Sequence, residues 1–231
     1  MVNIPSYVFT VVKRLESIGF QAYLAGGCVR DSIMNIAPND YDITTNARPE
    51  EIKNVFRDFK LILTGEKHGT VAVITNGGII EITSYRLEKG YTDGRHPDNV
   101  EFTSSLIEDL RRRDFTVNAM AYGIHDGLID PFNGRDDIKN KIIRTVGAPE
   151  KRFEEDALRI LRGLRFSSRL GFSIESGTAE AVHNLRLLLK NISAERIRDE
   201  FVQIIRGQNA GEVLKSYRDV ISVFIPEVIP V

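Results

Sequence analysis

Two carboxylates one residue apart, Asp40 and Asp42, are the residues of this chain best suited to chemistry. They open a β-rich run, predicted as a strand over residues 40–45, in which residues i and i+2 point to the same face. Two like charges that close are costly unless a cation lies between them. A small number of oxygen ligands suits Mg²⁺, which keeps waters and completes its shell with substrate phosphates. The spacing therefore predicts a magnesium site on this pair.

A glycine turn just before the carboxylates is suited to phosphates. Gly26 and Gly27 follow an apolar strand predicted over residues 21–25 and precede a short helix predicted over residues 29–34. Glycine lets a backbone approach a phosphate without a Cβ in the way. Arg30, one turn on, offers a planar guanidinium to the same anion. A Gly-Gly turn alone is more often only a turn, so it is the order of these parts that points to chemistry.

The elements that must position these residues read as an α/β domain. Periodicity predicts helices over residues 6–19, 49–56 and 106–113, and strands over residues 59–63, 70–75, 79–85 and 142–146. Polar residues 87–100 predict a loop. Glu81 lies between two isoleucines on a predicted strand, where it is either a third metal ligand or a solvent-facing glutamate.

Composition limits the class of protein. The 231 residues carry a formal net charge of -1, which argues against non-specific coating of nucleic acid but not against a local basic groove. Cys28 is the only cysteine, so an internal disulfide is impossible and a reducing compartment fits. No signal pattern and no membrane-spanning apolar run is present, so we expect a soluble, cytoplasmic protein.

From residue 149 the pattern becomes helical. One helix is predicted over residues 149–170, followed by helices over residues 175–189, 194–206 and 210–217. Asp156, Arg159, Arg162 and Arg165 recur at three-residue steps and largely share one face of the first of these helices. Such spacing is most often a solvated face laced with ion pairs. Three arginines nevertheless outnumber the local acids, which favours a binding role.

Three stretches together resemble a known family. They are Gly-Gly-Cys-Val-Arg-Asp followed by Asp-Tyr-Asp, then Arg-Arg-Asp-Phe-Thr-Val-Asn-Ala at residues 112–119, and Glu-Asp-Ala-Leu-Arg-Ile-Leu-Arg at residues 155–162. These resemble motifs A, B and D of the class II tRNA nucleotidyltransferases (CCA-adding enzymes) and bacterial poly(A) polymerases, within the DNA polymerase beta-like superfamily. The resemblance implies an α/β (α+β) nucleotidyltransferase head with a mixed or antiparallel sheet, followed by an all-α neck.

The resemblance also implies roles for single residues. Asp40 and Asp42 would be catalytic and would hold Mg²⁺, with Glu81 as a candidate third ligand. The nucleotide-binding residues would be Gly27, Arg30, Arg113, Asp156, Arg159, Arg162 and Arg165. Asp156 and the first arginine after it would read the base, because a carboxylate and a guanidinium match the edges of cytosine and adenine but not those of guanine and uracil.

The implied function is two-metal, template-independent addition of the 3′-terminal CCA to tRNA from CTP and ATP. The implied domains are a head at residues 1–148, a neck at residues 149–207 and the start of a truncated helical body at residues 208–231. Residues 64–70 resemble the CCA-adding branch rather than the poly(A) branch. An A-adding-only relative, a poly(A) polymerase and a nucleotide- or RNA-binding module made inactive by truncation remain alternatives, and no membrane partner is expected.

Overall fold

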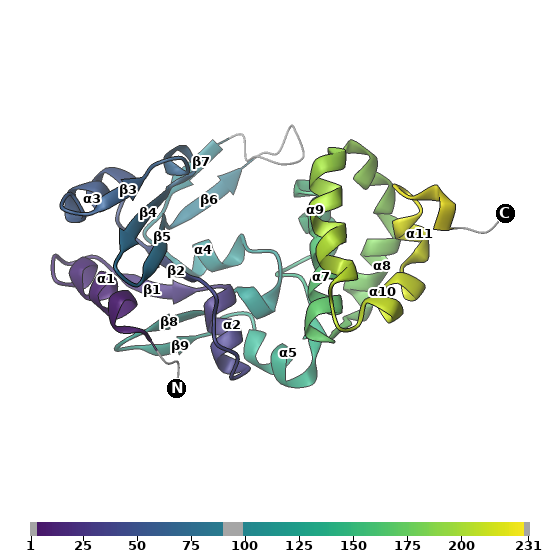
Figure 1. The fold of residues 1–231 in the computed structure, drawn as a ribbon, viewed down its shortest axis with the longest axis horizontal. Helices are drawn as coiled ribbons and strands as arrows, with labels where there is room; N and C mark the ends of the chain where they lie inside the picture. The colour runs from purple at the N-terminus through teal and green to yellow at the C-terminus, as the bar shows by residue number, and fades with distance from the viewer. Residues whose placement is uncertain (1–3, 90–98, 229–231) are drawn as a thin grey trace. The chain divides into compact units, whose positions relative to one another are not determined.

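The computed structural model of this protein describes residues 4–89 and 99–228. These residues form two compact units (Figure 1). The first, the sheet unit, comprises residues 4–89, 99–113 and 117–135. The second, the helical unit, comprises residues 114–116 and 136–228.

The sheet unit is built on a seven-stranded sheet with the strand order β3-β4-β5-β2-β1-β8-β9. Its strands are β1 (Ala22–Ala25), β2 (Tyr41–Thr45), β3 (Lys60–Ile62), β4 (Thr70–Thr75), β5 (Gly78–Ser84), β8 (Ala121–Gly123) and β9 (Gly127–Ile129). β2 and β5 run parallel, and the other neighbouring pairs are antiparallel. The predicted mixed sheet is thus confirmed. β8 and β9 were not predicted from the sequence, because each is only three residues long.

The helices of the sheet unit are α1 (Ser6–Glu16), α2 (Gly27–Ile33), α3 (Pro49–Val55) and α4 (Leu106–Arg111), with a 3₁₀ turn at Glu66–His68. α1 follows its predicted apolar spacing, because Val8, Val11, Val12 and Leu15 are all buried. α2 begins at Gly27, directly at the glycine turn. α4 ends two residues earlier than predicted, so Arg113 follows this helix and does not lie on it.

The two faces of the sheet differ because residues alternate along β2 and β5. Tyr41 and Ile43 pair with Ile80 and Ile82 on one face, and all four are buried. α1 lies on this apolar face, where the ring of its Tyr7 packs edge-on against Tyr41 at 6.2 Å. Asp42 and Thr44 pair with Glu81 and Thr83 on the opposite, polar face. The alternation therefore places Asp42, which is predicted to bind a metal ion, on the face opposite these buried apolar side chains.

The predicted loop over residues 87–100 is wrong at both ends. β6 (Arg86–Lys89) and β7 (Asn99–Phe102) pair as an antiparallel ladder, with Leu87 opposite Glu101. Polar composition concealed this hairpin, because a two-stranded ladder outside the main sheet needs little apolar alternation. Residues 90–98, including His96, for which no role is predicted, lie outside the described residues.

The helical unit contains a short parallel pair and a bundle of helices. Its elements are α5 (Gly134–Asn140, entered from the sheet unit), β10 (Ile142–Ile143), α6 (Pro149–Glu155), α7 (Leu158–Leu170), β11 (Ser173–Ile174), α8 (Ser176–Asn184), a 3₁₀ helix (Arg186–Asn191), α9 (Ala194–Ile205), α10 (Ala210–Ser216) and α11 (Arg218–Ile221), with a further 3₁₀ turn at Pro226–Val228. The 3₁₀ turn at Thr116–Asn118 begins in this unit and ends in the sheet unit. The strand predicted over residues 142–146 as the last of the head is present as β10, but it is only two residues long and pairs with β11 in this second unit. No helix within residues 4–89 and 99–228 is both long and apolar enough to span a bilayer.

The single helix predicted over residues 149–170 is also wrong. α6 ends at Glu155, and Asp156 adopts an extended conformation with φ -146° and ψ 104°. Its Oδ1 accepts the backbone N–H of Leu158 at 3.0 Å, an Asx turn that favours the start of a new helix over continuation of the old one. Asp156 therefore precedes α7, whereas Arg159 lies within it.

α7 is packed into the core of the helical unit. Leu158, Leu161, Leu164 and Phe166 are buried, as predicted. Near its C-terminal end the helix meets the end of α9, where Ser168 Oγ donates to the carbonyl of Ile204 at 2.6 Å.

Gly207 makes this approach possible, and Gly207→Ala is expected to destabilise the helical unit by about 2–4 kcal/mol. A Cβ at this position would lie 2.6 Å from the carbonyl carbon of Ser168, which is backbone and cannot rotate away. Chemical denaturation measures the effect. Gly211→Ala on α10 is the matched control, because a Cβ there meets nothing within 4 Å. That variant is expected to gain up to about 1 kcal/mol from helix propensity. Equal effects of the two substitutions would contradict the packing argument.

Candidate functional site

The carboxylates of the sheet unit come together on two neighbouring strands. Asp42 on β2 stands in register with Glu81 on β5, so both side chains leave the same face of the sheet. Asp40 immediately precedes β2 and is exposed. Burial, followed by the charges of Asp40 and Glu81, raises the pKa of Asp42 to about 6, whereas Arg113 lowers it. The surroundings of Asp42 therefore disfavour the ionised form of its carboxylate.

A divalent cation fits this crowding because it would favour the ionised form of Asp42. Among the residues that the structure describes, no three His, Cys, Asp or Glu side chains are arranged to hold a metal ion. A site on two carboxylates still suits Mg²⁺, which takes its remaining ligands from waters and substrate phosphates. The role of Glu81 as a third ligand remains a prediction.

The glycine turn depends on Gly26 more than on Gly27. Gly26 has φ 77° and ψ -131°, a conformation that L-residues avoid, and its N–H donates to the carbonyl of Met120 at 3.2 Å. A Cβ on Gly26 would lie 2.7 Å from Nη1 of Arg113, whereas a Cβ on Gly27 would meet nothing closer than Arg30 Nη2 at 3.7 Å. The bare backbone at Gly26 therefore makes room for an arginine of the same unit.

Arg30 and Arg113 converge on one residue that the sequence analysis did not select, Asn118. Arg30 Nη1 donates to Asn118 Oδ1 at 2.6 Å, and Arg113 Nη1 donates to the carbonyl of Asn118 at 3.4 Å. Arg30 also pairs with Asp31 at 2.7 Å. The structure thus brings together both arginines that were predicted to bind phosphates. Asn118 carries no charge, so its residue type alone does not mark it as part of the site.

The contacts of Arg113 leave one of its buried hydrogen-bond donors without a partner among the described residues. Its Nη2 lies 3.7 Å from Asp109, and its Nε is a buried donor without a hydrogen-bond partner among the described residues. A buried unpaired guanidinium donor is costly and suits a site that receives an anion.

In the helical unit each predicted residue already has a carboxylate or cationic partner. Arg159 is 8% exposed and donates from Nη1 to Glu155 at 2.7 Å and to the carbonyl of Arg152 at 3.2 Å. The Oδ2 of Asp156 lies 3.4 Å from Arg196 Nη2. The side chains of Asp156 and Arg159 therefore bind different neighbours in this structure, although they are close in sequence.

Arg162 and Arg165 find their acids far away in the chain. Arg162 Nε donates to Asp114 at 2.7 Å, and Arg165 Nη1 donates to Glu200 at 3.0 Å. Both guanidinium groups also lie over the ring of Phe166, at 5.7 and 4.7 Å from its centroid. The excess of arginine along α7 is thus matched by acids that sequence spacing could not reveal, because they are 48 and 35 residues distant.

The Asp114–Arg162 pair predicts a loss of stability in acid. Burial raises the pKa of Asp114, but the Arg162 guanidinium outweighs it and holds that pKa at about 2. Because this folded-state pKa lies below the ordinary value near 3.9, the ionised carboxylate stabilises the fold at and above pH 5. The contribution, about 2–3 kcal/mol, falls by roughly half at pH 3 and disappears below pH 2.

Denaturation of the unchanged chain and of Asp114→Asn at several pH values tests this. The stability difference between the two proteins is expected to shrink by about 1 kcal/mol between pH 5 and pH 3. A difference that stays constant over this range would contradict the assigned pair. Asp136→Asn is the control, because Asp136 is an exposed carboxylate of the same unit.

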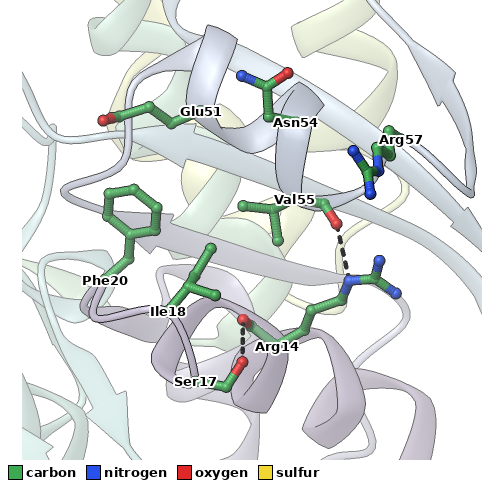
Figure 2. A pocket seen from close by; sticks show the side chains of 8 residues that line it. All are labelled: Arg14, Ser17, Ile18, Phe20, Glu51, Asn54, Val55 and Arg57. Atoms are coloured by element: carbon green, nitrogen blue, oxygen red, sulfur yellow. Dashed lines mark hydrogen bonds between the residues drawn. The ribbon is translucent and has the colours of Figure 1, made fainter.

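A pocket of about 460 Å³ lies elsewhere in the sheet unit, between the end of α1 and α3 (Figure 2). It is lined by Arg14, Ser17, Ile18, Phe20, Glu51, Asn54, Val55 and Arg57. Arg14 is engaged there by the carbonyl of Val55 at 2.8 Å. None of the lining residues is a predicted site residue, so this pocket is not the candidate site.

Comparisons with known proteins identify two matching families and several relatives. Residues 22–144 match the family described as "Poly A polymerase head domain", and residues 171–228 match "Probable RNA and SrmB-binding site of polymerase A". The chain is similar to a CCA-adding enzyme of Lactobacillus helveticus, with 50% identity over 209 residues that cover 90% of this chain and 52% of the relative.

Two solved structures are also similar. The Bacillus stearothermophilus CCA-adding enzyme in complex with CTP matches with a TM-score of 0.82 and 41% identity, over 91% of this chain and 50% of that one. The Thermotoga maritima CCA-adding enzyme complexed with tRNA-CCA matches with a TM-score of 0.79 and 29% identity, over 98% and 54%. The chain thus spans about half the length of the relatives it matches.

Proposed function

The chain belongs to the family of the poly A polymerase head domain, and we propose that it is a tRNA nucleotidyltransferase that adds the 3′-terminal CCA from CTP and ATP. The observation that carries the proposal is 50% identity to a CCA-adding enzyme over 90% of the chain. In this reaction the terminal 3′-oxygen of tRNA bonds to the α-phosphorus of the nucleotide. The α–β phosphoanhydride bond breaks, pyrophosphate leaves, and the hydroxyl proton passes to solvent.

Asp40 and Asp42 would hold Mg²⁺ in this function. A bound ion would lower the pKa of the attacking hydroxyl and neutralise charge on the phosphates. The crowding that raises the pKa of Asp42 supports this assignment, since a cation would stabilise the carboxylates that now disfavour one another. With only two protein ligands, the triphosphate itself would become part of the site.

Arg30 and Arg113 would position the triphosphate. Both guanidinium groups contact Asn118, and the buried Nε of Arg113 offers a donor that a phosphate oxygen can accept. Gly27 would contribute backbone that approaches the same phosphates. Charge-assisted bonds of this kind orient the α-phosphorus and stabilise charge that develops on it.

Asp156 and Arg159 would select the base, with Arg162 and Arg165 making further nucleotide contacts. A carboxylate accepts from the exocyclic amine of cytosine or adenine, and a guanidinium donates to the adjacent ring nitrogen. A guanidinium carries five donors, so contact with Glu155 and contact with a base are compatible. Within the proposed head at residues 1–148, neck at residues 149–207 and partial body at residues 208–231, selection would belong to the neck.

Incubation with each labelled NTP and with tRNA ending before CCA, at C or at CC tests the proposal. We expect addition of two cytidines and then one adenosine, with no incorporation of GTP or UTP. Addition of A only to the CC-ended tRNA would indicate an A-adding relative. Long A tails on a plain oligonucleotide would indicate a poly(A) polymerase. Nucleotide binding without incorporation into any tRNA would indicate a binding module.

Asp156→Ala is expected to lower the preference for CTP over UTP by roughly tenfold, since one specific carboxylate contact is lost. Competing incorporation of the two nucleotides into tRNA lacking CCA measures this preference. Because Asp156 also forms the turn before α7, circular dichroism should accompany the assay. Glu154→Gln is the matched control in the preceding helix. Unchanged preference in folded Asp156→Ala would contradict the assigned role.

A further inference from the structure

Asp109 is a carboxylate that the proposed chemistry does not use, although it is completely buried at 0% exposure. It lies on α4, four residues before Arg113. A buried carboxylate is costly unless its oxygens are paired, so its partners show what it holds in place.

The two oxygens of Asp109 gather three separate segments of the sheet unit. Oδ2 accepts the hydroxyl of Thr44 at 3.0 Å and lies 3.7 Å from Arg113 Nη2. Oδ1 accepts Arg112 Nε at 2.9 Å and the backbone N–H of Arg86 at 3.3 Å. The carboxylate therefore joins β2, the end of α4 and the start of β6.

Thr44 connects Asp109 to the strand that carries Asp42. It follows Asp42 by two residues on β2, so both side chains leave the same face of the sheet. Through Thr44 and Arg113, Asp109 links the strand that carries the metal-binding carboxylate to a guanidinium assigned to the triphosphate. The contact of Arg113 with the carbonyl of Asn118 is long at 3.4 Å.

We propose that Asp109 is a positioning residue that fixes the guanidinium of Arg113 relative to Asp42. The inference rests on the proposed function, in which Arg113 contacts the triphosphate. An amide in place of the carboxylate keeps the size of Asp109 but turns one acceptor into a donor. At the position of Oδ2 that donor would face Thr44 and Arg113. At the position of Oδ1 it would face Arg112 and the N–H of Arg86. In either orientation Arg113 would lose the charge of the carboxylate that anchors it.

Asp109→Asn is expected to lower kcat/KM for CTP by roughly 10- to 100-fold, since a small misplacement of a positioning group has effects of this size. The KM for tRNA is expected to stay within about twofold, because none of the residues that Asp109 contacts is assigned to tRNA. Glu108→Gln is the matched control on the same helix. Glu108 pairs with Arg111 at 3.7 Å with a side chain that is 40% exposed, so its kinetics should be those of the unchanged chain.

A double-mutant cycle with Arg113→Ala separates positioning from a general structural role. If Asp109 acts through Arg113, adding Asp109→Asn to Arg113→Ala should change CTP incorporation and CTP affinity by less than about twofold. An Asp109→Asn variant with unchanged kinetics would overturn the inference. So would a full Asp109→Asn loss that persists without Arg113.

Two further measurements keep the inference separate from folding and from the proposed function. If Asp109→Asn unfolds, Thr44→Val decides, with an expected fall in kcat/KM of roughly three- to tenfold that also vanishes in the Arg113→Ala background. Unchanged kinetics of Thr44→Val would then overturn the inference. If the unchanged chain incorporates no nucleotide, the proposed function fails. CTP titration calorimetry then decides, because roughly tenfold weaker binding by Asp109→Asn is still expected.

Discussion

Asp42→Asn is expected to lower nucleotide incorporation by at least about 1,000-fold and, in metal-free buffer, to make the folded chain more stable. The first effect follows from losing a carboxylate that would hold Mg²⁺. The second follows from removing a buried charge that lies near Asp40 and Glu81, which together with burial raise the pKa of Asp42 to about 6. Since one pKa unit corresponds to about 1.4 kcal/mol, a gain of about 1–3 kcal/mol at pH 7.5 is expected.

Single-turnover incorporation and thermal unfolding in EDTA measure the two effects. Added Mg²⁺ should raise the unfolding midpoint of the unchanged chain but not that of Asp42→Asn. Glu180→Gln, which neutralises an exposed carboxylate on α8, is the control and should leave both readouts unchanged. Incorporation by Asp42→Asn near the rate of the unchanged chain would remove the metal assignment. Glu81→Gln, measured in the same way, tests the predicted third ligand.

Gly26→Ala is expected to reduce incorporation by roughly 100-fold and stability by about 1–3 kcal/mol. Two observations lead to the same result. The backbone at Gly26 has φ 77°, which strains any residue with a Cβ, and that Cβ would lie 2.7 Å from Nη1 of Arg113. The arginine would have to leave its contact with Asn118, so the group that we propose binds phosphate would be misplaced.

Gly27→Ala is the matched comparison for stability. Its Cβ would lie 3.7 Å from Arg30 Nη2, an ordinary contact, and no positive φ is required there. Urea unfolding of both variants, with CTP incorporation by Gly26→Ala, measures the effects. We expect Gly27→Ala to stay within about 0.5 kcal/mol of the unchanged chain. Similar destabilisation by both substitutions would mean that the turn, and not the approach of Arg113, decides the effect.

Local chemistry made much of the sheet unit predictable. The alternation of Tyr41, Asp42 and Ile43 gave the strand and its faces, and Asn-Gly-Gly at residues 76–78 marked the turn between β4 and β5. The helix break at Asp156 was not predictable from the spacing of apolar residues, because that spacing continues through the break. The break coincides with a hydrogen bond from the backbone N–H of Leu158 to the side-chain oxygen of Asp156. β10 was misplaced because a strand of two residues carries too little pattern to identify its partner.

The partners of the candidate residues likewise divide into those that local sequence could reveal and those that depend on tertiary structure. The types and order of Asp40, Asp42 and Arg30 predict the chemistry, but the sequence could not place Asn118 between two arginines. Asp109 carried a usable signal, because an acid with arginines three and four residues later is an ion-pairing pattern on a helix. Asp114 and Glu200 carried none, since their pairing with α7 depends on tertiary structure.

The short segment 114–116 has a practical consequence for anyone who wishes to cut this protein in two. It belongs to the helical unit, although the chain on either side of it belongs to the sheet unit. A gene product that starts at residue 136 would therefore lack Asp114, and Arg162 would keep its charge without that carboxylate. It would also lack Phe115, whose ring packs at 5.7 Å against Phe166. The helical unit is thus expected to express poorly when it is produced from residue 136 onward. Joining residues 114–116 to it would be needed to restore these contacts.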